Sequence, residues 1–317
     1  MKTKKIGLVG IYFPGAYDAL HENVPEGFEL VDALSPEAYG NLADCEYLIS
    51  RLDIDPDIIN HTPNVKFWQR WGAGFDHVDL KAWSERGIPI ATCPGVNSGI
   101  VAELAIMLML AGYRNLLQIN RQLRAGHWPR TEYFGRSFMI KGKTVGVLGL
   151  GHIGKKVAAL ASAFGANVIY YDIVRQPEQE EQFGYRFVDF DTLLKESDIF
   201  TIHCPLNEET RGMIGAAQFA KMKPTAMLIN TARGPIVDEA ALVDALTTGK
   251  IATAGLDTYE HEPLPKDHPL LTLDNVVASA HAGGNTKDND INMVNYVYHN
   301  IVAFDRGEPL NTPGDIV

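Results

Sequence analysis

The chain has 317 residues, of which 46% are hydrophobic, and a formal net charge of −11 at neutral pH. This length is too great for one ordinary α/β core and predicts two domains, while the acidic charge argues against non-specific nucleic-acid binding. No apolar run approaches the length that spans a membrane, and the N-terminal segment is too short and too strand-like for a signal peptide. The cysteines Cys45, Cys93 and Cys204 have no metal-ligand or disulfide spacing, so we expect no metal site and a cytoplasmic location.

The first hundred residues predict a small α/β unit. Short apolar runs alternate there with polar or helical stretches, as is typical of a parallel sheet, at residues 6–9, 47–49, 65–68 and 88–91. Residues 100–124 are apolar, rich in Ala and Leu and free of proline, and they predict one long helix. The broad apolar face of this helix favours a buried packing surface or a subunit interface.

A second series of strand-like runs follows, at residues 144–148, 168–171, 199–203, 226–230, 251–256 and 276–278. Six strands with intervening helical stretches predict a doubly wound Rossmann domain. Residues 286–306 then have the apolar spacing of a helix, which ends at Gly307 with Pro309 beyond it.

The segment Gly149-Leu150-Gly151-His152-Ile153-Gly154 follows the first run of this series and opens an Ala-rich helical stretch. In such a turn Gly149 permits the tight bend, Gly151 lets the backbone approach a pyrophosphate, and Gly154 allows close packing of helix and strand. Asp172 ends the next strand-like run, where a carboxylate accepts a hydrogen bond from a ribose 2′-hydroxyl and repels a 2′-phosphate. The pattern predicts NAD as the cofactor, with NADP left open by the nearby Arg175.

Arg233, Glu262 and His281 each follow a later strand of the same series. Ligands of an open α/β sheet bind beyond the carboxyl ends of the strands, so these side chains should face the open side of the nucleotide. Reduction of a 2-oxo acid needs a guanidinium that binds the carboxylate, and Arg233 can supply it. The reaction also needs a proton donor, a role that fits His281, with Glu262 keeping the imidazole charged. Each residue also has a structural explanation: Arg233 as a loop anchor, Glu262 as a solvated turn residue, and His281 as a core histidine.

Together these motifs resemble the D-isomer-specific 2-hydroxyacid dehydrogenase family over nearly the whole chain. The resemblance rests on residues 145–154, 171–172, 203–207, 229–234, 237–239, 255–257, 262–264 and 281. It implies catalytic roles for Arg233, Glu262 and His281, and substrate contacts from Arg233 and His281 and from a loop of Gly72, Ala73 and Gly74. The implied cofactor contacts are Gly149, Gly151, His152, Ile153, Gly154, Asp172, His203, Cys204, Pro205, Thr210, Thr231, Ala232, Arg233, Asp257, His281, Gly283 and Gly284.

The predicted fold is α/β, with a doubly wound Rossmann NAD-binding domain at residues 100–285 inserted into a smaller flavodoxin-like substrate domain of residues 1–99 and 286–317. We predict an NAD-dependent oxidoreductase that reversibly reduces a 2-oxo acid to the (R)-2-hydroxy acid. Glyoxylate or hydroxypyruvate, a branched 2-oxo acid and a phosphoglycerate dehydrogenase-like substrate remain alternatives, and Arg51 either binds a second anionic group such as phosphate or forms a surface salt bridge. A different class, an NAD-sensing corepressor or scaffold on the same fold, is also left open. The resemblance further implies a homodimer through residues 100–124, without a nucleic-acid or membrane partner.

Overall fold

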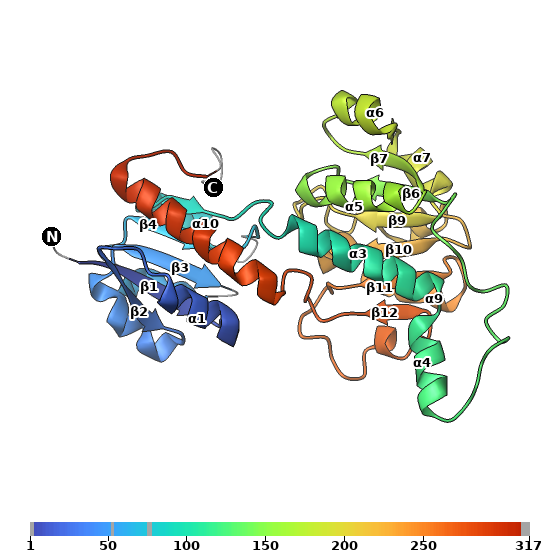
Figure 1. The fold of residues 1–317 in the computed structure, drawn as a ribbon, viewed down its shortest axis with the longest axis horizontal. Helices are drawn as coiled ribbons and strands as arrows, with labels where there is room; N and C mark the ends of the chain where they lie inside the picture. The colour runs from blue at the N-terminus through green and yellow to red at the C-terminus, as the bar shows by residue number, and fades with distance from the viewer. Residues whose placement is uncertain (1–2, 52–53, 75–77, 312–317) are drawn as a thin grey trace. The chain divides into compact units, whose positions relative to one another are not determined.

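The computed structural model describes residues 3–51, 54–74 and 78–311 of the chain. The chain forms two compact units, which we call unit 1, made of Met1–Asn97 with Asn285–Val317, and unit 2, made of Ser98–Gly284 (Figure 1). Both units are built on a parallel sheet, so the predicted α/β fold class is confirmed. The substrate and nucleotide roles given to the two parts of the chain stay predictions at this point.

Unit 1 contains, within the described residues, a five-stranded parallel sheet of order β2-β1-β3-β4-β5. This order is the flavodoxin-like one. The strands are β1 Lys4–Gly10, β2 Phe28–Ala33, β3 Tyr47–Arg51, β4 Phe67–Arg70 and β5 Ile90–Ala91. The helices are α1 Pro14–Glu22, α2 Leu80–Glu85 and α10 Lys287–Arg306, with 3-10 helices η1 Pro36–Asp44 and η2 Pro56–His61.

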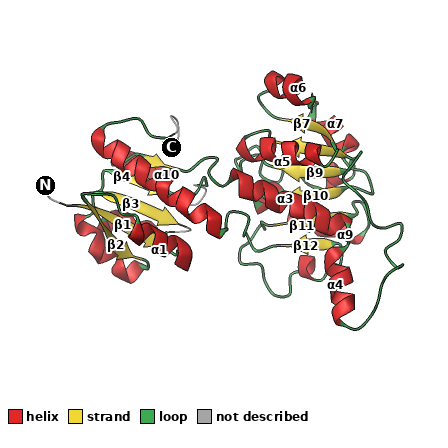
Figure 2. Ribbon diagram, viewed as in Figure 1, coloured by secondary structure: helices red, strands yellow, loops and turns green. Residues whose placement is uncertain are grey.

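Helices cover both faces of the unit 1 sheet (Figure 2). On one face, Leu20 of α1 and Val297 of α10 pack against strand residues such as Ile6 and Ile49, all of them fully buried. On the other face, η1, η2 and α2 supply the buried partners of Leu48 and of the other strand residues that point to that face. The sheet is therefore a two-sided core, in which alternate residues of each strand are buried in opposite directions.

Unit 2 contains a seven-stranded parallel sheet in the described residues, of order β12-β11-β10-β9-β6-β7-β8. Its strands are β6 Thr144–Leu148, β7 Asn167–Tyr171, β8 Arg186–Phe187, β9 Ile199–Ile202, β10 Met227–Asn230, β11 Thr253–Leu256 and β12 Val276–Ala278. The strand order reverses between β6 and β9, which pair directly. This reversal is the topological switch point where a doubly wound sheet binds its ligand.

The helices of unit 2 are α3 Ser98–Tyr113, α4 Leu116–Arg124, α5 His152–Ala163, α6 Pro177–Phe183, α7 Phe190–Glu196, α8 Ala216–Phe219 and α9 Glu239–Thr247, with 3-10 helices η3 Gly234–Ile236 and η4 Pro269–Leu271. Figure 1 shows α3 and α5 side by side across the sheet, and their buried residues share one hydrophobic core. Buried residues of α7, α8 and α9 belong to a second core. The sheet thus has a helical layer on each face.

The prediction of one long helix over residues 100–124 was wrong, because the segment forms α3 and α4, bent by 62° at a short break. Asn115 adopts a left-handed conformation there, with φ of 50°. Its side-chain amide donates to the carbonyl of Arg136 and to the hydroxyl of Ser137. In the described residues no single helix is long and apolar enough to cross a membrane, and only this bent pair reaches that length and apolarity when taken together.

Candidate active site

The glycine-rich turn joins β6 to α5 at the switch point of unit 2. Gly149 has a φ of 90°, and a Cβ on it would lie 2.7 Å from the backbone nitrogen of Cys204. A Cβ on Gly154 would overlap the carbonyl oxygen of Gly149. These two glycines are therefore required by close backbone packing, as their motif predicts.

Gly151 differs from its two neighbours, because a Cβ on it would meet no heavy atom within 4 Å. It is the N-cap residue of α5 and provides no side-chain cap for the helix. His152 is exposed and Ile153 is partly buried in the first turn of α5. A helix N-terminus with unpaired N–H groups, opening onto free space beside a tight turn, fits the pyrophosphate of a dinucleotide.

Asp172 follows β7 and lies beside this turn. Its Oδ2 accepts a hydrogen bond from the backbone N–H of Leu150 at 2.6 Å, and its Oδ1 accepts one from Val174 at 3.2 Å. The carboxylate therefore links the second strand of the nucleotide fold to the glycine-rich turn. It stands at the position from which such an acid contacts a ribose.

The loop after β9 contains His203, Cys204, Pro205 and Thr210. Nε2 of His203 is hydrogen-bonded to Oγ1 of Thr201 at 2.8 Å, and its buried Nδ1 has no partner among the described residues. Burial lowers the pKa of His203 to about 3, so the ring is neutral at ordinary pH. The Thr210 hydroxyl donates to the carbonyl of Pro205 at 2.7 Å and thereby holds the loop.

The turn after β10 contains Thr231, Ala232 and Arg233. Buried Asn230 shapes this turn, because its amide donates to the carbonyl of Arg233 and its Oδ1 accepts from the N–H of Ala232. The Arg233 guanidinium donates to the carbonyl of Ala232 at 2.8 Å. Oγ1 of Thr231 is buried without a partner in the described part of the chain, like Nδ1 of His203.

Two unpaired buried polar atoms thus follow adjacent strands at the edge where a cofactor is expected. Together with the open space at Gly151, they indicate that the residues present fit a bound dinucleotide. Burial raises the pKa of the Cys204 thiol to about 11, so this cysteine is not a thiolate nucleophile.

Asp257 follows β11 and holds the turn that carries His281. Its side chain is buried, and its two carboxylate oxygens accept the N–H groups of Ala282 at 2.9 Å and Gly283 at 3.0 Å. Its backbone carbonyl accepts the N–H of His281 at 2.8 Å. His281 has a φ of 50°, a left-handed conformation that only a well-determined surrounding maintains in a residue other than glycine.

Glu262 and His281 are brought together by the loops after β11 and β12. Oε2 of Glu262 lies 2.7 Å from Nδ1 of His281, and Oε1 accepts the N–H of Tyr259 at 3.0 Å. Burial raises the pKa of Glu262, but the hydrogen bonds from His281 and Tyr259 outweigh it, and the pKa lies below the usual value. The side chains of His281 and Glu262 are 49% and 34% exposed, so the pair is accessible. A carboxylate bound to Nδ1 orients the imidazole, whose Nε2 is the atom that would exchange a proton with a ligand.

Tyr259 and Gly234 are positioning residues, a role that their sequence context does not predict. The Tyr259 hydroxyl donates to the carbonyl of Ser279 at 2.7 Å, which joins the loop of Glu262 to the segment between β12 and His281. A Cβ on Gly234 would overlap the backbone of Tyr259. A glycine directly after Arg233 was the available signal, but its contact partner is 25 residues away in the chain.

The loop of Gly72, Ala73 and Gly74 follows β4 in unit 1. Gly72 has a φ of 127°, and its carbonyl accepts the N–H of Cys93 at 2.8 Å. The prediction that Arg51 forms a surface salt bridge was wrong, because its side chain is buried. Its guanidinium donates to the carbonyl of Ile11 and to Oδ1 of Asn285, and it lies 4.1 Å from the ring centre of Phe13. The anion-binding alternative for Arg51 stays a prediction.

A glycine-rich turn at the switch point of a doubly wound sheet, with a carboxylate–imidazole pair and an arginine on the same sheet edge, defines a nucleotide-dependent dehydrogenase. The comparisons with known proteins identify the family. The model of the family described as "D-isomer specific 2-hydroxyacid dehydrogenase, NAD binding domain" matches residues 106–283. The chain therefore belongs to the D-isomer specific 2-hydroxyacid dehydrogenases, and it is an NAD-dependent oxidoreductase.

Individual relatives agree with this assignment. The chain is 43% identical over 82% of its length to a D-3-phosphoglycerate dehydrogenase of Archaeoglobus fulgidus, and it spans only 49% of that relative. It is 39% identical over 84% of its length to a glyoxylate reductase of Korarchaeum cryptofilum, of which it covers 81%. The solved NAD complexed form of a D-isomer specific 2-hydroxyacid dehydrogenase from Lactobacillus delbrueckii ssp. bulgaricus matches with a TM-score of 0.80 and 29% identity, over 99% of this chain and 100% of that one.

Proposed function

We propose that the enzyme reduces a small 2-oxo acid of the glyoxylate and hydroxypyruvate class, with Arg233, Glu262 and His281 as its catalytic residues. The observation that carries this proposal is the 2.7 Å pair between Glu262 and His281 on the sheet edge that also bears the glycine-rich turn. The name of the glyoxylate reductase relative supports the substrate class. The remaining cofactor contacts expected from the sequence are part of the same proposal.

In the proposed mechanism, bound NADH supplies the hydride that adds to the carbonyl carbon. Arg233 pairs with the substrate carboxylate and fixes the carbonyl relative to His281. Negative charge develops on the carbonyl oxygen, and His281 donates a proton from Nε2 to that oxygen. Glu262 orients the imidazole through its contact with Nδ1. The reverse reaction uses neutral His281 as the base that takes the hydroxyl proton.

The roles of the two units follow from the same proposal. Unit 2 carries the glycine-rich turn and the three catalytic residues, and we assign it the cofactor. Unit 1 carries the loop of Gly72, Ala73 and Gly74, and we assign it the amides that bind the substrate carboxylate.

The first experiment follows NADH oxidation with glyoxylate, hydroxypyruvate, pyruvate, phosphohydroxypyruvate and 4-methyl-2-oxopentanoate. We expect the highest kcat/KM with glyoxylate or hydroxypyruvate. His281→Ala should lower kcat by roughly 100- to 10,000-fold and spare NADH binding measured by fluorescence. Full activity in His281→Ala would refute the acid–base assignment. NADH binding without turnover of any substrate would favour the sensing role instead.

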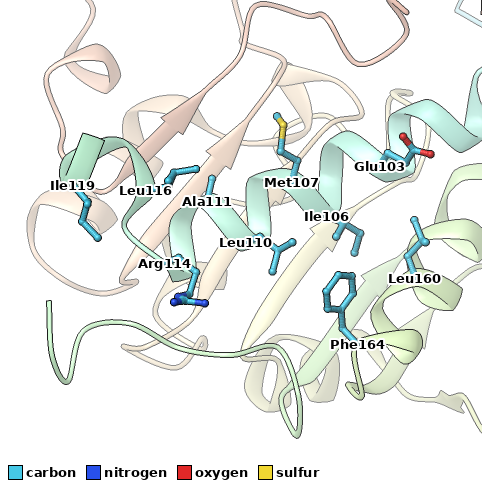
Figure 3. A pocket seen from close by; sticks show the side chains of 10 residues that line it. All are labelled: Glu103, Ile106, Met107, Leu110, Ala111, Arg114, Leu116, Ile119, Leu160 and Phe164. Carbon is cyan, nitrogen blue, oxygen red and sulfur yellow. The ribbon is translucent and has the colours of Figure 1, made fainter. Parts of the chain in front are cut away.

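We also propose a homodimer formed through α3 and α4. A groove of about 770 Å³ lies between these two helices and α5. Figure 3 shows the side chains that line it. The groove is lined by Glu103, Ile106, Met107, Leu110, Ala111, Arg114, Leu116, Ile119, Leu160 and Phe164. Met107 is 52% exposed and Leu116 is 54% exposed, and a second copy of the chain would cover such apolar side chains.

Light scattering tests the dimer, which should have twice the chain mass of 34.9 kDa. Met107→Glu and Leu116→Glu should each shift the mass toward the monomer. Ile173→Glu, at an apolar residue that is 88% exposed and outside the groove, is the matched control and should stay dimeric. A wild-type protein of monomeric mass would contradict the proposal.

A further inference from the structure

The loop after β7 contains both of the signals that distinguish NAD from NADP. In dinucleotide-binding folds, an acid after the second strand contacts the ribose 2′-hydroxyl of NAD, whereas a nearby arginine accommodates the 2′-phosphate of NADP. This chain has Asp172 and, three residues later, Arg175. Residue types alone therefore favour NAD but leave NADP open, and the contacts of Arg175 bear on how NADP is disfavoured.

Arg175 is held by Glu180 of α6 in a two-point contact. Nε of Arg175 lies 2.9 Å from Oε1 of Glu180, and Nη2 lies 2.7 Å from Oε2. The guanidinium carbon also lies 5.6 Å from the ring centre of Phe187. A planar guanidinium uses this same paired geometry to bind a phosphate, so the carboxylate occupies the Nε–Nη2 edge of Arg175 that could otherwise pair with a 2′-phosphate.

Glu180 is itself fixed by the strand that precedes the loop. The hydroxyl of buried Tyr170 donates to Oε1 of Glu180 at 2.7 Å, and the same hydroxyl accepts the N–H of Gln176 at 2.8 Å. The hydrogen bonds from Arg175 and then from Tyr170 lower the pKa of Glu180 to about 2. The carboxylate is therefore ionised and positioned before any cofactor arrives.

The surrounding charges act in the same direction. Glu180 neutralises Arg175, while Asp172 and the exposed residues Glu178 and Glu181 contribute negative charge to the same loop and helix. A 2′-phosphate carries about two negative charges at neutral pH. It would meet a negative field with its nearest arginine already paired.

We propose that Glu180 is a specificity-determining residue, which selects NAD by pairing Arg175 and withholding its guanidinium from a 2′-phosphate. The inference rests on the family's NAD site at the glycine-rich turn and on the proposed placement of the adenosine ribose beside Asp172. NADP is then disfavoured in two ways. Asp172 repels the 2′-phosphate, and the arginine that would bind this phosphate is already paired with Glu180.

Two fragments that differ only in the 2′-phosphate, 5′-AMP and 2′,5′-ADP, test this proposal by calorimetry without any turnover. Glu180→Gln should raise the affinity for 2′,5′-ADP about tenfold, as expected for one charge-assisted contact, and change that for 5′-AMP less than twofold. The NADPH to NADH ratio of kcat/KM should rise in parallel. High salt should reduce the gain, because the new contact is exposed.

Three further variants control the result. Glu178→Gln removes an exposed negative charge from the same helix but leaves Arg175 paired, so it should raise the 2′,5′-ADP affinity much less than Glu180→Gln does. Arg175→Gln alone should also have little effect, because the guanidinium is already paired in the wild type. Adding Arg175→Gln to Glu180→Gln should abolish the gain.

Three outcomes would overturn the proposal. An unchanged 2′,5′-ADP affinity in Glu180→Gln would do so, and so would equal changes for both fragments, which indicate a purely structural role. A large loss of 2′,5′-ADP affinity in Arg175→Gln would show that the arginine reaches the phosphate despite its pairing. Asp172→Asn tests the placement of the adenosine ribose separately from the role of Glu180. If this variant leaves 5′-AMP binding unchanged, the ribose does not lie beside Asp172.

Discussion

Asp257→Asn tests how the turn of His281 is maintained. The carboxylate accepts two backbone N–H groups, from Ala282 and Gly283, inside a buried site. The amide of asparagine can accept only one of them, and its NH₂ group would face the other N–H. Loss of one charge-assisted hydrogen bond costs about 1.5–3 kcal/mol, and an unsatisfied buried donor costs about 1–3 kcal/mol. We therefore expect a loss of about 3 kcal/mol in the stability of unit 2.

Thermal unfolding of the whole chain, followed by calorimetry, measures this loss. For a domain of the size of unit 2, about 3 kcal/mol corresponds to a decrease in Tm of roughly 6–12 °C. Because the left-handed backbone of His281 depends on the same anchor, kcat should fall by about 10- to 100-fold through misplacement of the imidazole.

Asp238→Asn is the matched control in the same unit. Asp238 caps α9 by accepting one N–H, from Ala241 at 2.9 Å, and asparagine serves equally well at such a position. We expect its Tm and kcat to stay near those of the wild type. An Asp257→Asn protein with a Tm within about 3 °C of the wild type would refute the argument that the carboxylate holds the turn.

Three other predictions address the same sheet edge. Gly234→Ala should destabilise the protein by about 1–3 kcal/mol and lower kcat/KM, because the new Cβ overlaps the backbone of Tyr259. Gly99→Ala is the control, because a Cβ there meets nothing within 4 Å, and it should be neutral in both denaturant unfolding and steady-state assays. Burial of His203 should make the protein less stable as the pH is lowered. Its pKa is about 3 in the fold and about 6.5 when unfolded, so only the unfolded chain gains the proton between these values. Between pH 7 and pH 5 the free energy of unfolding should decrease by about 2 kcal/mol because of this group, and His203→Gln should lack this decrease. The same dependence of unfolding free energy on pH in both proteins would show that His203 is not held neutral by burial. Gly154→Val should abolish NADH binding measured by fluorescence, since its side chain overlaps the carbonyl of Gly149, and retained affinity would show that the turn adjusts.

The strands of unit 2 were mostly predictable because they are buried on both faces and appear as unbroken apolar runs. Two edge strands, β2 of unit 1 and β8 of unit 2, were not predicted. β2 carries Glu29 and Asp32 within its six residues, and β8 has only two residues, so neither shows an apolar run. The break between α3 and α4 depends on hydrogen bonds from Asn115 to residues more than 20 positions away, which helical periodicity does not reveal.

In the candidate site, the sequence identified ionisable residues that follow strands, because the carboxyl ends of parallel strands share one edge. It could not identify how these residues are held. Asp257 resembled a cofactor contact, whereas its carboxylate is engaged by the turn of His281. The roles of Tyr259 and Gly234 depend on contacts between separate loops, and no local pattern in the sequence encodes these contacts.

The insertion of unit 2 into unit 1 has a consequence for biosynthesis. The first five strands emerge from the ribosome early, but one face of their sheet is covered by α10, whose buried residues include Val294, Val297 and Ile301. All of unit 2 must be translated before this helix is made, whereas unit 2 is continuous in sequence and has its own cores. Unit 2 can therefore fold during translation while the earlier sheet waits with an apolar face uncovered, and this interval is when the nascent chain most needs protection from aggregation.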